Sequence, residues 1–191
     1  MNKKKFPVPI YLIRHGEAES SWDQDSNPGL SKKGKRQSLE LATSLKNYIL
    51  EEKFTIISSP LKRALETAQP VLESNNLTFS INKIFSEIPS PGIELSDRKE
   101  WLRKIFTINK NKLLEPQSNW LKNILTEISN IKKPTLIFSH FMVINVIVGE
   151  ILKSKKLVIF NPDNCSVTKI TSKNKELRII ERGREFTTTI N

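Results

Sequence analysis

The chain of 191 residues contains a single cysteine, Cys165, and therefore cannot close an internal disulfide. A domain of this length can bury one hydrophobic core and needs no disulfide framework. Only six glycines are present, so flexible Gly-rich linkers are also missing. These absences exclude a disulfide-rich secreted scaffold. They predict one folded domain, residues 1–191, in a reducing, cytoplasmic compartment.

Long hydrophobic runs are absent as well, and no segment approaches the roughly 20 apolar residues of a transmembrane helix. The first residues, MNKKKFPVPIYLIRHG, place lysines before an apolar stretch, as a signal peptide does. Prolines interrupt that stretch, and Arg14 and His15 end it early. We therefore expect neither a secretion signal nor a membrane partner.

Acidic residues are outnumbered, with 20 Asp and Glu against 31 Lys and Arg and a net charge of +11. Such an excess attracts anions, whether phosphate esters, nucleic acids or membrane surfaces. The lysines are spread along the chain, whereas a nucleic-acid-binding surface normally concentrates them on one face. A solvated basic surface with no specific nucleic-acid partner is the expectation.

Short apolar runs of strand length alternate with longer segments of helical period, a pattern typical of α/β domains. We predict a three-layer α/β sandwich with a mostly parallel central sheet and helices on both faces. The expected strands are Pro9–Ile13, Phe54–Ser58, Leu77–Ile81 and Pro134–Ser139. Alternating apolar residues then predict a C-terminal hairpin, formed by Ser166–Thr171 and Glu176–Glu181 around a turn at SKNK.

Helices are expected between these strands. The first follows Ser31, a candidate N-cap, and a second follows Pro60, with Pro70 kinking it or ending its first part. One buried face of the first helix is predicted to carry Leu39, Leu41, Ala42, Leu45, Tyr48 and Ile49. Three later helices are predicted at Trp101–Phe106, Asn119–Ile131 and Met142–Leu152, the last apolar enough to be buried.

The only two histidines, His15 and His140, each directly follow a predicted strand. Arg14 precedes His15, and Arg63 lies one turn into the helix after the second strand. The carboxyl ends of parallel strands form the ligand-binding edge of an α/β sheet, so these four residues are expected to meet there. Two imidazoles and two guanidinium groups suit chemistry on an oxyanion such as a phosphoryl group.

Four segments carry a family resemblance. They are RHGE at the end of the first strand, LSKKG followed by Gln37, SSPLKRALETAQ after the second strand, and Ser139-His140. In this order, over about residues 9–152, they resemble the signatures of the histidine phosphatase superfamily, also called phosphoglycerate mutase-like. The resemblance implies a phosphoglycerate mutase-like fold.

The resemblance also implies an activity, the hydrolysis of phosphomonoesters through a phosphohistidine intermediate on His15. Arg14, Arg63 and His140 would bind and stabilise the transferring phosphoryl group. A neutral imidazole can attack phosphorus near physiological pH because its ordinary pKa is about 6.5. Neighbouring arginines would oppose its protonation and bind phosphoryl oxygens, and no metal or cofactor is expected.

The same resemblance implies that a carboxylate after the third strand supplies the proton for the leaving oxygen. Glu87 is the predicted general acid and base, with Glu94 and Asp97 as alternatives. Glu17 follows His15 too closely for this task and is expected to orient neighbouring groups by hydrogen bonding.

Two features depart from the family pattern. Phe141 and Met142 stand where the family often has glycines, and their bulk is expected to narrow or reshape the pocket. Mutases of this family carry Trp-Asn shortly after RHGE, whereas Trp22-Asp23 lies further along here, with no long closing segment. Hydrolysis is therefore favoured over one alternative, a phosphoglycerate mutase. The intact set of Arg14, His15, Arg63 and His140 argues against the other alternative, a non-enzymatic basic anion-binding module.

Substrate choice is assigned to a helical insert at about residues 88–130, which would overhang the site. The expected substrate is a small phosphorylated metabolite. Neither the particular ester nor an oligomeric state can be read from the sequence.

Overall fold

A computed structural model describes residues 7–21, 23–51, 53–75, 77 and 79–186, and Trp22 therefore lies outside the described part. The strands are β1 (Val8–Arg14), β2 (Thr55–Ser58), β3 (Ser80–Ile81), β4 (Thr135–Ser139), β5 (Val167–Lys173) and β6 (Glu176–Glu181). The helices are α1 (Lys32–Glu51), α2 (Lys62–Asn75), α3 (Arg98–Thr107), α4 (Gln117–Asn130) and α5 (Phe141–Ile151). Short 3₁₀ turns lie at η1 (Lys83–Phe85), η2 (Leu95–Asp97) and η3 (Lys110–Lys112).

The strands form one six-stranded sheet in the order β3-β2-β4-β1-β5-β6. The first four of these strands run parallel, whereas β5 pairs antiparallel with β1 and β6 pairs antiparallel with β5. The register places Arg14 opposite Ser139 and Ser58 opposite Phe138, so β1, β4 and β2 end at the same level. The residues that follow these strands therefore share one edge of the sheet.

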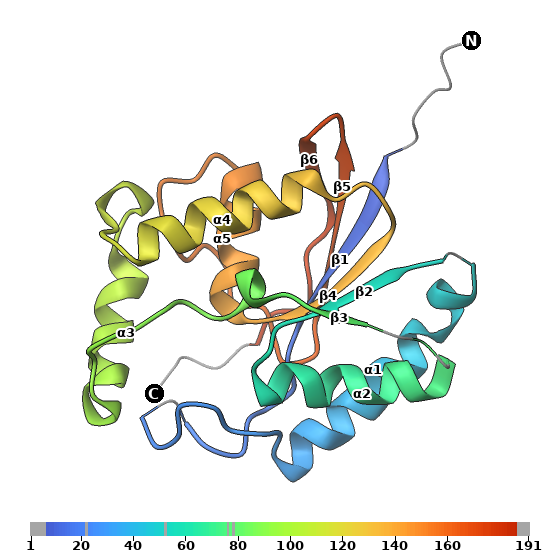
Figure 1. Ribbon diagram of the computed structural model, residues 1–191, viewed down its shortest axis with the longest axis horizontal. Helices are drawn as coiled ribbons and strands as arrows, with labels where there is room; N and C mark the ends of the chain where they lie inside the picture. Colours follow the sequence, from blue (N-terminus) through green and yellow to red (C-terminus); the bar gives the residue numbers. More distant parts are fainter. Residues whose placement is uncertain (1–6, 22, 52, 76, 78, 187–191) are drawn as a thin grey trace.

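Helices cover both faces of the sheet, with α1 and α2 on one side and α4 and α5 on the other (Figure 1). Side chains alternate between the two faces of a strand, and β1 shows this clearly. Ile10 and Leu12 join the core that includes α4 and α5, whereas Ile13 joins the core of α1 and α2. The predicted three-layer α/β sandwich is confirmed.

Helix α5 packs almost entirely inside the protein, as its composition predicted. Nine consecutive residues, Phe141 to Gly149, are buried. The one polar side chain among them, Asn145, donates to the Phe141 carbonyl and accepts from the Ile159 and Phe160 amides. The buried amide is thus paired, and it ties the segment after α5 back onto the helix.

Two predictions about α1 are wrong. Leu39 is 59% exposed and Tyr48 is 41% exposed, although both were assigned to its buried face. The buried stripe instead begins at Gly34 and continues through Ser38 at spacings of three and four residues. Leu39 lies one position beyond that stripe, and Tyr48 packs its ring edge against Tyr11 near the sheet. Including every apolar residue made the predicted face too wide.

Pro70 does not end α2, which runs without interruption to Asn75. Proline removes one helical N–H, but residues on both sides of it, Ala68, Val71 and Leu72, are buried against the core. Tertiary packing therefore holds this helix together.

The third strand is also shorter than predicted, since β3 contains only Ser80 and Ile81.

The C-terminal hairpin forms as expected, with a tight turn at Asn174 and Lys175. Both residues have positive φ, 53° and 68°, as a two-residue hairpin turn of this kind requires.

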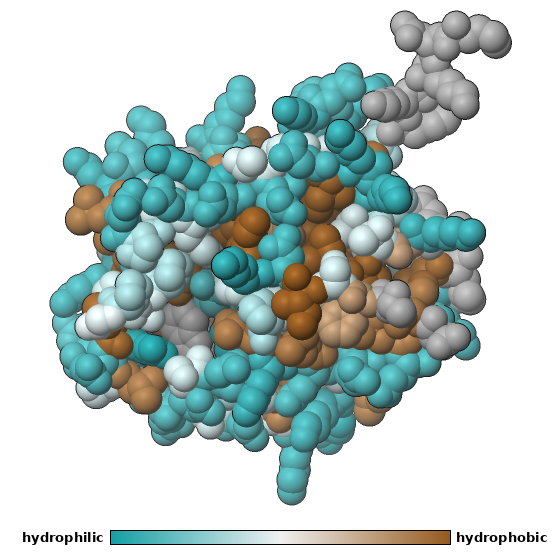
Figure 2. Space-filling view, in the orientation of Figure 1, coloured by the Kyte–Doolittle hydropathy of each residue, from teal (hydrophilic) through white to brown (hydrophobic). Residues whose placement is uncertain are grey.

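At the other edge of the sheet, Phe79 and Ile81 are exposed. Figure 2 shows apolar side chains gathering toward the centre of its view, inside a largely hydrophilic rim. No helix within the described part of the chain is long and apolar enough to cross a membrane.

Candidate active site

His15 directly follows β1 and is only 7% exposed. Its Nδ1 lies 2.7 Å from the Gly16 carbonyl oxygen, which can only accept a hydrogen bond, so Nδ1 carries the ring proton. Nε2 therefore has a free lone pair, and the Arg63 Nε–H donates to it at 3.1 Å. The imidazole is held in the tautomer that presents Nε2 for attack.

Arg14, the last residue of β1, is fixed by segments from the C-terminal third of the chain. Its Nη1 donates to the Pro162 carbonyl oxygen at 2.7 Å. The guanidinium carbon lies 5.4 Å from the centre of the Phe141 ring and 5.6 Å from that of Phe186. Two aromatic rings and a carbonyl therefore hold the cation next to His15.

Arg63 lies in the first turn of α2 and is buried. One turn later, the Thr67 hydroxyl donates to the Arg63 carbonyl at 2.6 Å and accepts from the Gly16 amide at 2.9 Å. This hydroxyl joins α2 to the loop that carries His15, so the arginine and the imidazole keep a fixed relative position.

His140 follows β4 and is completely buried. Its Nε2 lies 2.7 Å from the Ser59 hydroxyl oxygen, and its ring centre lies 5.2 Å from that of His15. The other ring nitrogen, Nδ1, has no hydrogen-bond partner among the described residues. The four side chains predicted to meet, Arg14, His15, Arg63 and His140, do lie together at one edge of the sheet.

Glu87 joins this group from the segment after η1. One carboxylate oxygen, Oε1, accepts from the amides of Ile88 and Met142, each at 3.1 Å. Met142 lies in the first turn of α5. Its backbone amide donates to the Glu87 carboxylate and is therefore not free to bind a ligand. The alternative carboxylates, Glu94 and Asp97, are exposed and do not line the pocket. The structure thus brings Glu87 to His15 and leaves the other two outside.

Burial sets the protonation states of the cluster. It lowers the pKa of His15 well below its ordinary value, and the positive charges of Arg63 and Arg14 lower it further. Burial lowers the pKa of His140 in the same way, again reinforced by Arg63. The pKa of Glu87 shifts in the opposite direction, because burial raises it and the positive charge of Arg63 only partly opposes the rise. The site combines neutral imidazoles with a carboxyl group that holds its proton more strongly than usual.

Four of these groups, Arg14, His15, Arg63 and Glu87, line a pocket of about 370 Å³, whereas the buried His140 lies behind it and is not among its described lining residues. Besides Arg14, His15, Arg63 and Glu87, the described residues that line it are Ala18, Ser20, Ser21, Pro28, Leu102, Phe106, Phe141, Met142 and Phe186. The bulky Phe141 and Met142 form part of the pocket wall.

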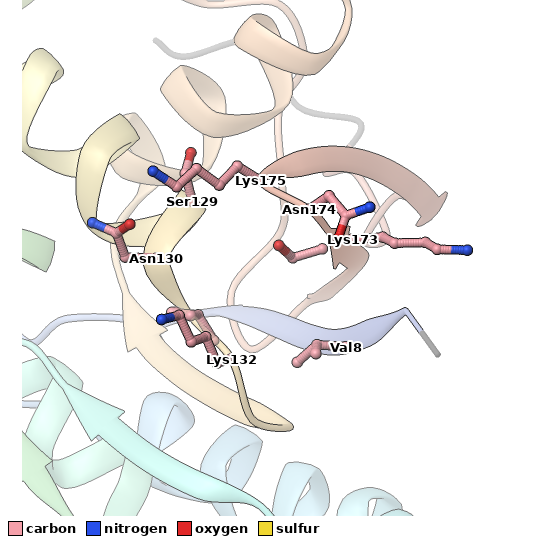
Figure 3. Close-up of a pocket in the computed structure, with 9 residues that line it drawn as sticks. Val8, Ser129, Asn130, Lys132, Lys173, Asn174 and Lys175 are labelled. Carbon is pink, nitrogen blue, oxygen red and sulfur yellow. The ribbon is translucent and has the colours of Figure 1, made fainter. Parts of the chain in front are cut away.

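A second pocket, of about 430 Å³, lies near the start of β1, between the end of α4 and the β5–β6 turn (Figure 3). Lys132, Lys173 and Lys175 line it, and Lys173 extends away from the other labelled side chains (Figure 3). It contains neither histidine nor carboxylate. The chemistry-bearing residues therefore gather at the opposite ends of the strands.

Glu17 and the LSKKG segment fix the loop that carries His15. Glu17 accepts from the Ser31 hydroxyl and from Lys33, each at 2.8 Å, while its amide donates to Gln37. Ser31 caps α1 by accepting from the Gly34 amide at 3.0 Å. A side chain at Gly34 would place its Cβ only 2.1 Å from the Glu17 carbonyl oxygen. The loop therefore packs directly on the first turn of α1.

Several site residues had no assigned role at the sequence level. Ser59 and Thr67 lie inside a recognised motif, and the spacing of four between Arg63 and Thr67 places both on one helix face. Phe106 and Phe186 come from distant segments, and only the fold brings them to His15.

Cys165 lies beside the site without taking part in it. Its amide donates to the Arg14 carbonyl at 3.1 Å, whereas burial raises the pKa of its thiol to about 12. Such a thiol is protonated and a poor nucleophile. Among the residues that the structure describes, no group of three or more His, Cys, Asp or Glu side chains is arranged to hold a metal ion.

Comparisons with known proteins agree with this geometry. A sequence model described as histidine phosphatase superfamily (branch 1) matches residues 10–184. The chain is 33% identical over 89 residues to a mannitol-1-phosphatase of Eimeria tenella, a match covering 38% of this chain and 29% of that protein. It is 40% identical over 76 residues to phosphoserine phosphatase 1 of Hydrogenobacter thermophilus, covering 37% and 34% of the two chains.

Solved structures extend the similarity of fold to nearly the whole chain. A phosphoserine phosphatase from Entamoeba histolytica superposes with a TM-score of 0.72 at 21% identity, covering 93% of this chain and 97% of the other. A mycobacterial glucosyl-3-phosphoglycerate phosphatase superposes with a TM-score of 0.71 at 14% identity, covering 94% and 100%.

Proposed function

The chain belongs to the histidine phosphatase superfamily, and from this premise we propose that it hydrolyses phosphomonoesters through a phosphohistidine intermediate on His15. The observation that carries the proposal is the state of His15, whose unprotonated Nε2 faces a pocket flanked by Arg14 and Arg63. A nucleophile, two cations and a carboxyl group whose pKa is raised by burial are the groups that phosphoryl transfer needs.

In the first step, the lone pair on His15 Nε2 attacks phosphorus and the bond to the ester oxygen breaks. Arg14, Arg63 and the Nδ1 side of His140 bind the phosphoryl oxygens and stabilise their charge. The His15 ring becomes cationic, and the hydrogen bond from Nδ1 to the Gly16 carbonyl strengthens as it does so.

Glu87 supplies the proton that the leaving oxygen needs. Its raised pKa keeps a larger fraction of the carboxyl protonated, and the Ile88 and Met142 amides hold it in place. In the second step, the ionised carboxylate takes a proton from water, whose oxygen attacks the phosphorus. The P–N bond breaks, inorganic phosphate leaves, and His15 returns to its neutral tautomer.

The positive charge that stabilises the transferring group comes from the arginines, so we propose that turnover needs no metal ion. The names of the curated relatives point to small phosphorylated metabolites as the substrate class. Net release of phosphate would separate this activity from that of a mutase.

The decisive assay measures phosphate release from p-nitrophenyl phosphate in excess chelator. We expect turnover by the wild type, a loss of about 10³-fold or more for His15→Ala, and no loss for the exposed control Leu114→Ala. A radioactive phosphoryl label on the wild type, stable to base and labile to acid, would identify phosphohistidine. Turnover that survives His15→Ala would refute the mechanism.

A further inference from the structure

The pocket beyond the phosphoryl-binding groups is strongly apolar. Helix α3 contributes Leu102 and Phe106, which lie one turn apart on the same face. The Phe106 ring stacks on Phe141 at 5.5 Å between centroids, with 27° between the ring planes. Phe186 and Met142 extend this wall. The part of the ester that leaves with the oxygen must contact these side chains.

Charge in the pocket is confined to the groups that act on phosphorus. Among its described lining residues, the only charged side chains are Arg14, Arg63 and Glu87. Arg14 is further occupied by Pro162 and two aromatic rings. The residues described around this part of the pocket include no additional cation that could pair with a carboxylate or a second phosphate on the substrate.

An anionic leaving group would therefore be poorly accommodated. A carboxylate placed against Leu102 and Phe106 would lose water without gaining an ionic partner. The two polar residues at the rim, Ser20 and Ser21, offer only neutral hydroxyls. An uncharged aromatic or alkyl group would instead gain from burial against the wall.

We propose that this chain prefers phosphomonoesters whose alcohol portion is uncharged and apolar, and that Leu102 and Phe106 select it. The inference rests on the proposed phosphatase activity and narrows its substrate class. It distinguishes this pocket from one that binds phosphoserine or phosphoglycerate, each of which carries a carboxylate close to the ester oxygen.

The test compares alkyl esters, so that leaving-group reactivity contributes little to the differences. We would measure kcat/KM for benzyl phosphate, O-phosphoserine, 3-phosphoglycerate and methyl phosphate. Burying a phenyl ring without opposing charge predicts that kcat/KM for benzyl phosphate exceeds that for either carboxylate ester by about tenfold or more. Methyl phosphate, which does not reach the apolar wall, reports the phosphoryl-binding groups alone.

Two variants place the selection on α3. Phe106→Ala is expected to lower kcat/KM for benzyl phosphate by roughly tenfold more than it lowers that for methyl phosphate. Leu102→Arg, at a partly exposed position that tolerates a charge more easily, should raise the ratio of 3-phosphoglycerate to benzyl phosphate turnover. Leu114→Ala, which alters an apolar residue far more exposed than either, should change neither ratio.

The outcomes separate the two levels of the proposal. Hydrolysis of phosphoserine or 3-phosphoglycerate at least as efficient as that of benzyl phosphate would overturn the substrate preference while leaving the phosphatase intact. An equal fall for benzyl and methyl phosphate in Phe106→Ala would overturn the selecting role of α3. No turnover of any ester, methyl phosphate included, would overturn the phosphatase function and the preference together.

Discussion

At the scale of single residues, the contact between Arg63 and His15 would link phosphate binding to nucleophile activation in the proposed mechanism. The Arg63 Nε–H donates to the same Nε2 lone pair that would attack phosphorus. An arriving phosphoryl group offers that guanidinium stronger, charged acceptors, so binding would draw Arg63 away from the imidazole. The lone pair is then released at the moment the substrate arrives.

The pH dependence of turnover should report Glu87. Burial raises its pKa, and the general acid must be protonated in the first step, so kcat/KM should fall as pH rises through that raised value. His15 stays neutral to a lower pH than an ordinary histidine, so the acidic limb of the pH profile, where His15 becomes protonated, should lie below pH 6.5. A pH profile of kcat/KM for an alkyl phosphate tests both limbs.

Glu87→Gln provides the matched control, since it keeps the shape but carries no transferable proton. We expect a loss of about 10²- to 10⁴-fold with an alkyl ester and disappearance of the basic limb. The activity of Glu87→Gln toward an aryl ester, whose leaving oxygen needs little protonation, should fall by a smaller factor. A basic limb that persists unchanged in Glu87→Gln would show that another group donates the proton.

Stability should also respond to pH through the two buried histidines. Their pKa values are lower in the folded protein, so below about pH 6.5 the unfolded chain binds more protons and unfolding is favoured. Each histidine removes up to about 1.4 kcal/mol of stability per pH unit in the range between its unfolded and folded pKa values. The raised pKa of Glu87 acts in the opposite direction, from about pH 4.5 up to its folded value.

Urea unfolding at pH 7.0 and 5.5 would measure this effect. The wild type is expected to lose more stability on acidification than the double variant His15→Gln/His140→Gln, because Glu87 is present in both. Equal losses in the two proteins would mean that the histidines are not held neutral.

Much of the candidate site was predictable because its residues occur in short motifs beside strand ends. Arg14, His15, Arg63 and His140 lie where parallel strands stop, so topology alone brings them together. Phe186 could not be assigned, because nothing near it in the sequence indicates that its ring packs on Arg14, 172 positions away.

At the scale of elements, the first turn of α1 serves as the base for the loop that carries His15. Ser31 and Gln37 bind Glu17, and Gly34 permits the close approach of its carbonyl. The LSKKG segment therefore acts through packing and hydrogen bonds with the neighbouring loop. Its contribution to the site is positional.

Gly34→Ala should displace this loop. Its Cβ would overlap the Glu17 carbonyl, so we expect a loss of about 1–3 kcal/mol of stability together with lower kcat. Ser31→Ala provides a comparison, because it removes a cap worth about 1 kcal/mol and one hydrogen bond to Glu17 without a steric clash, so its effect on kcat should be smaller. Thermal unfolding and steady-state kinetics would test the pair. A Gly34→Ala protein with wild-type kcat would contradict the positional role.

Strand and helix positions were predicted well because their apolar runs are short and clearly bounded. The errors arose where packing decided the outcome. Leu39 and Tyr48 are apolar but lie outside the stripe that faces the sheet. Pro70 lies inside α2, where the burial of its neighbours stabilises the helix. Periodicity identifies a helix more reliably than it identifies the limits of its buried face.

At the scale of the whole molecule, the net charge of +11 should steer phosphate esters toward the site. Raising ionic strength from about 0.01 M to about 0.15 M shortens the screening length from about 30 Å to about 8 Å. We therefore expect kcat/KM for a dianionic ester to fall several-fold while kcat changes little.

Steady-state kinetics in sodium chloride and in potassium chloride at equal ionic strength would separate screening from specific ion effects. A kcat/KM that is independent of salt would show that long-range attraction contributes little to substrate capture.

The clamp on Arg14 has a consequence for the timing of synthesis. The Arg14 guanidinium is fixed by Pro162 and Phe186, which are synthesised long after Arg14 and the neighbouring His15. A nascent chain that has emerged only through α5 already contains His15, Arg63 and His140 but lacks two of the groups that hold Arg14, Pro162 and Phe186. Arg14 is therefore held in its observed position only after the chain has been synthesised through Phe186 and that segment has folded back beside β1.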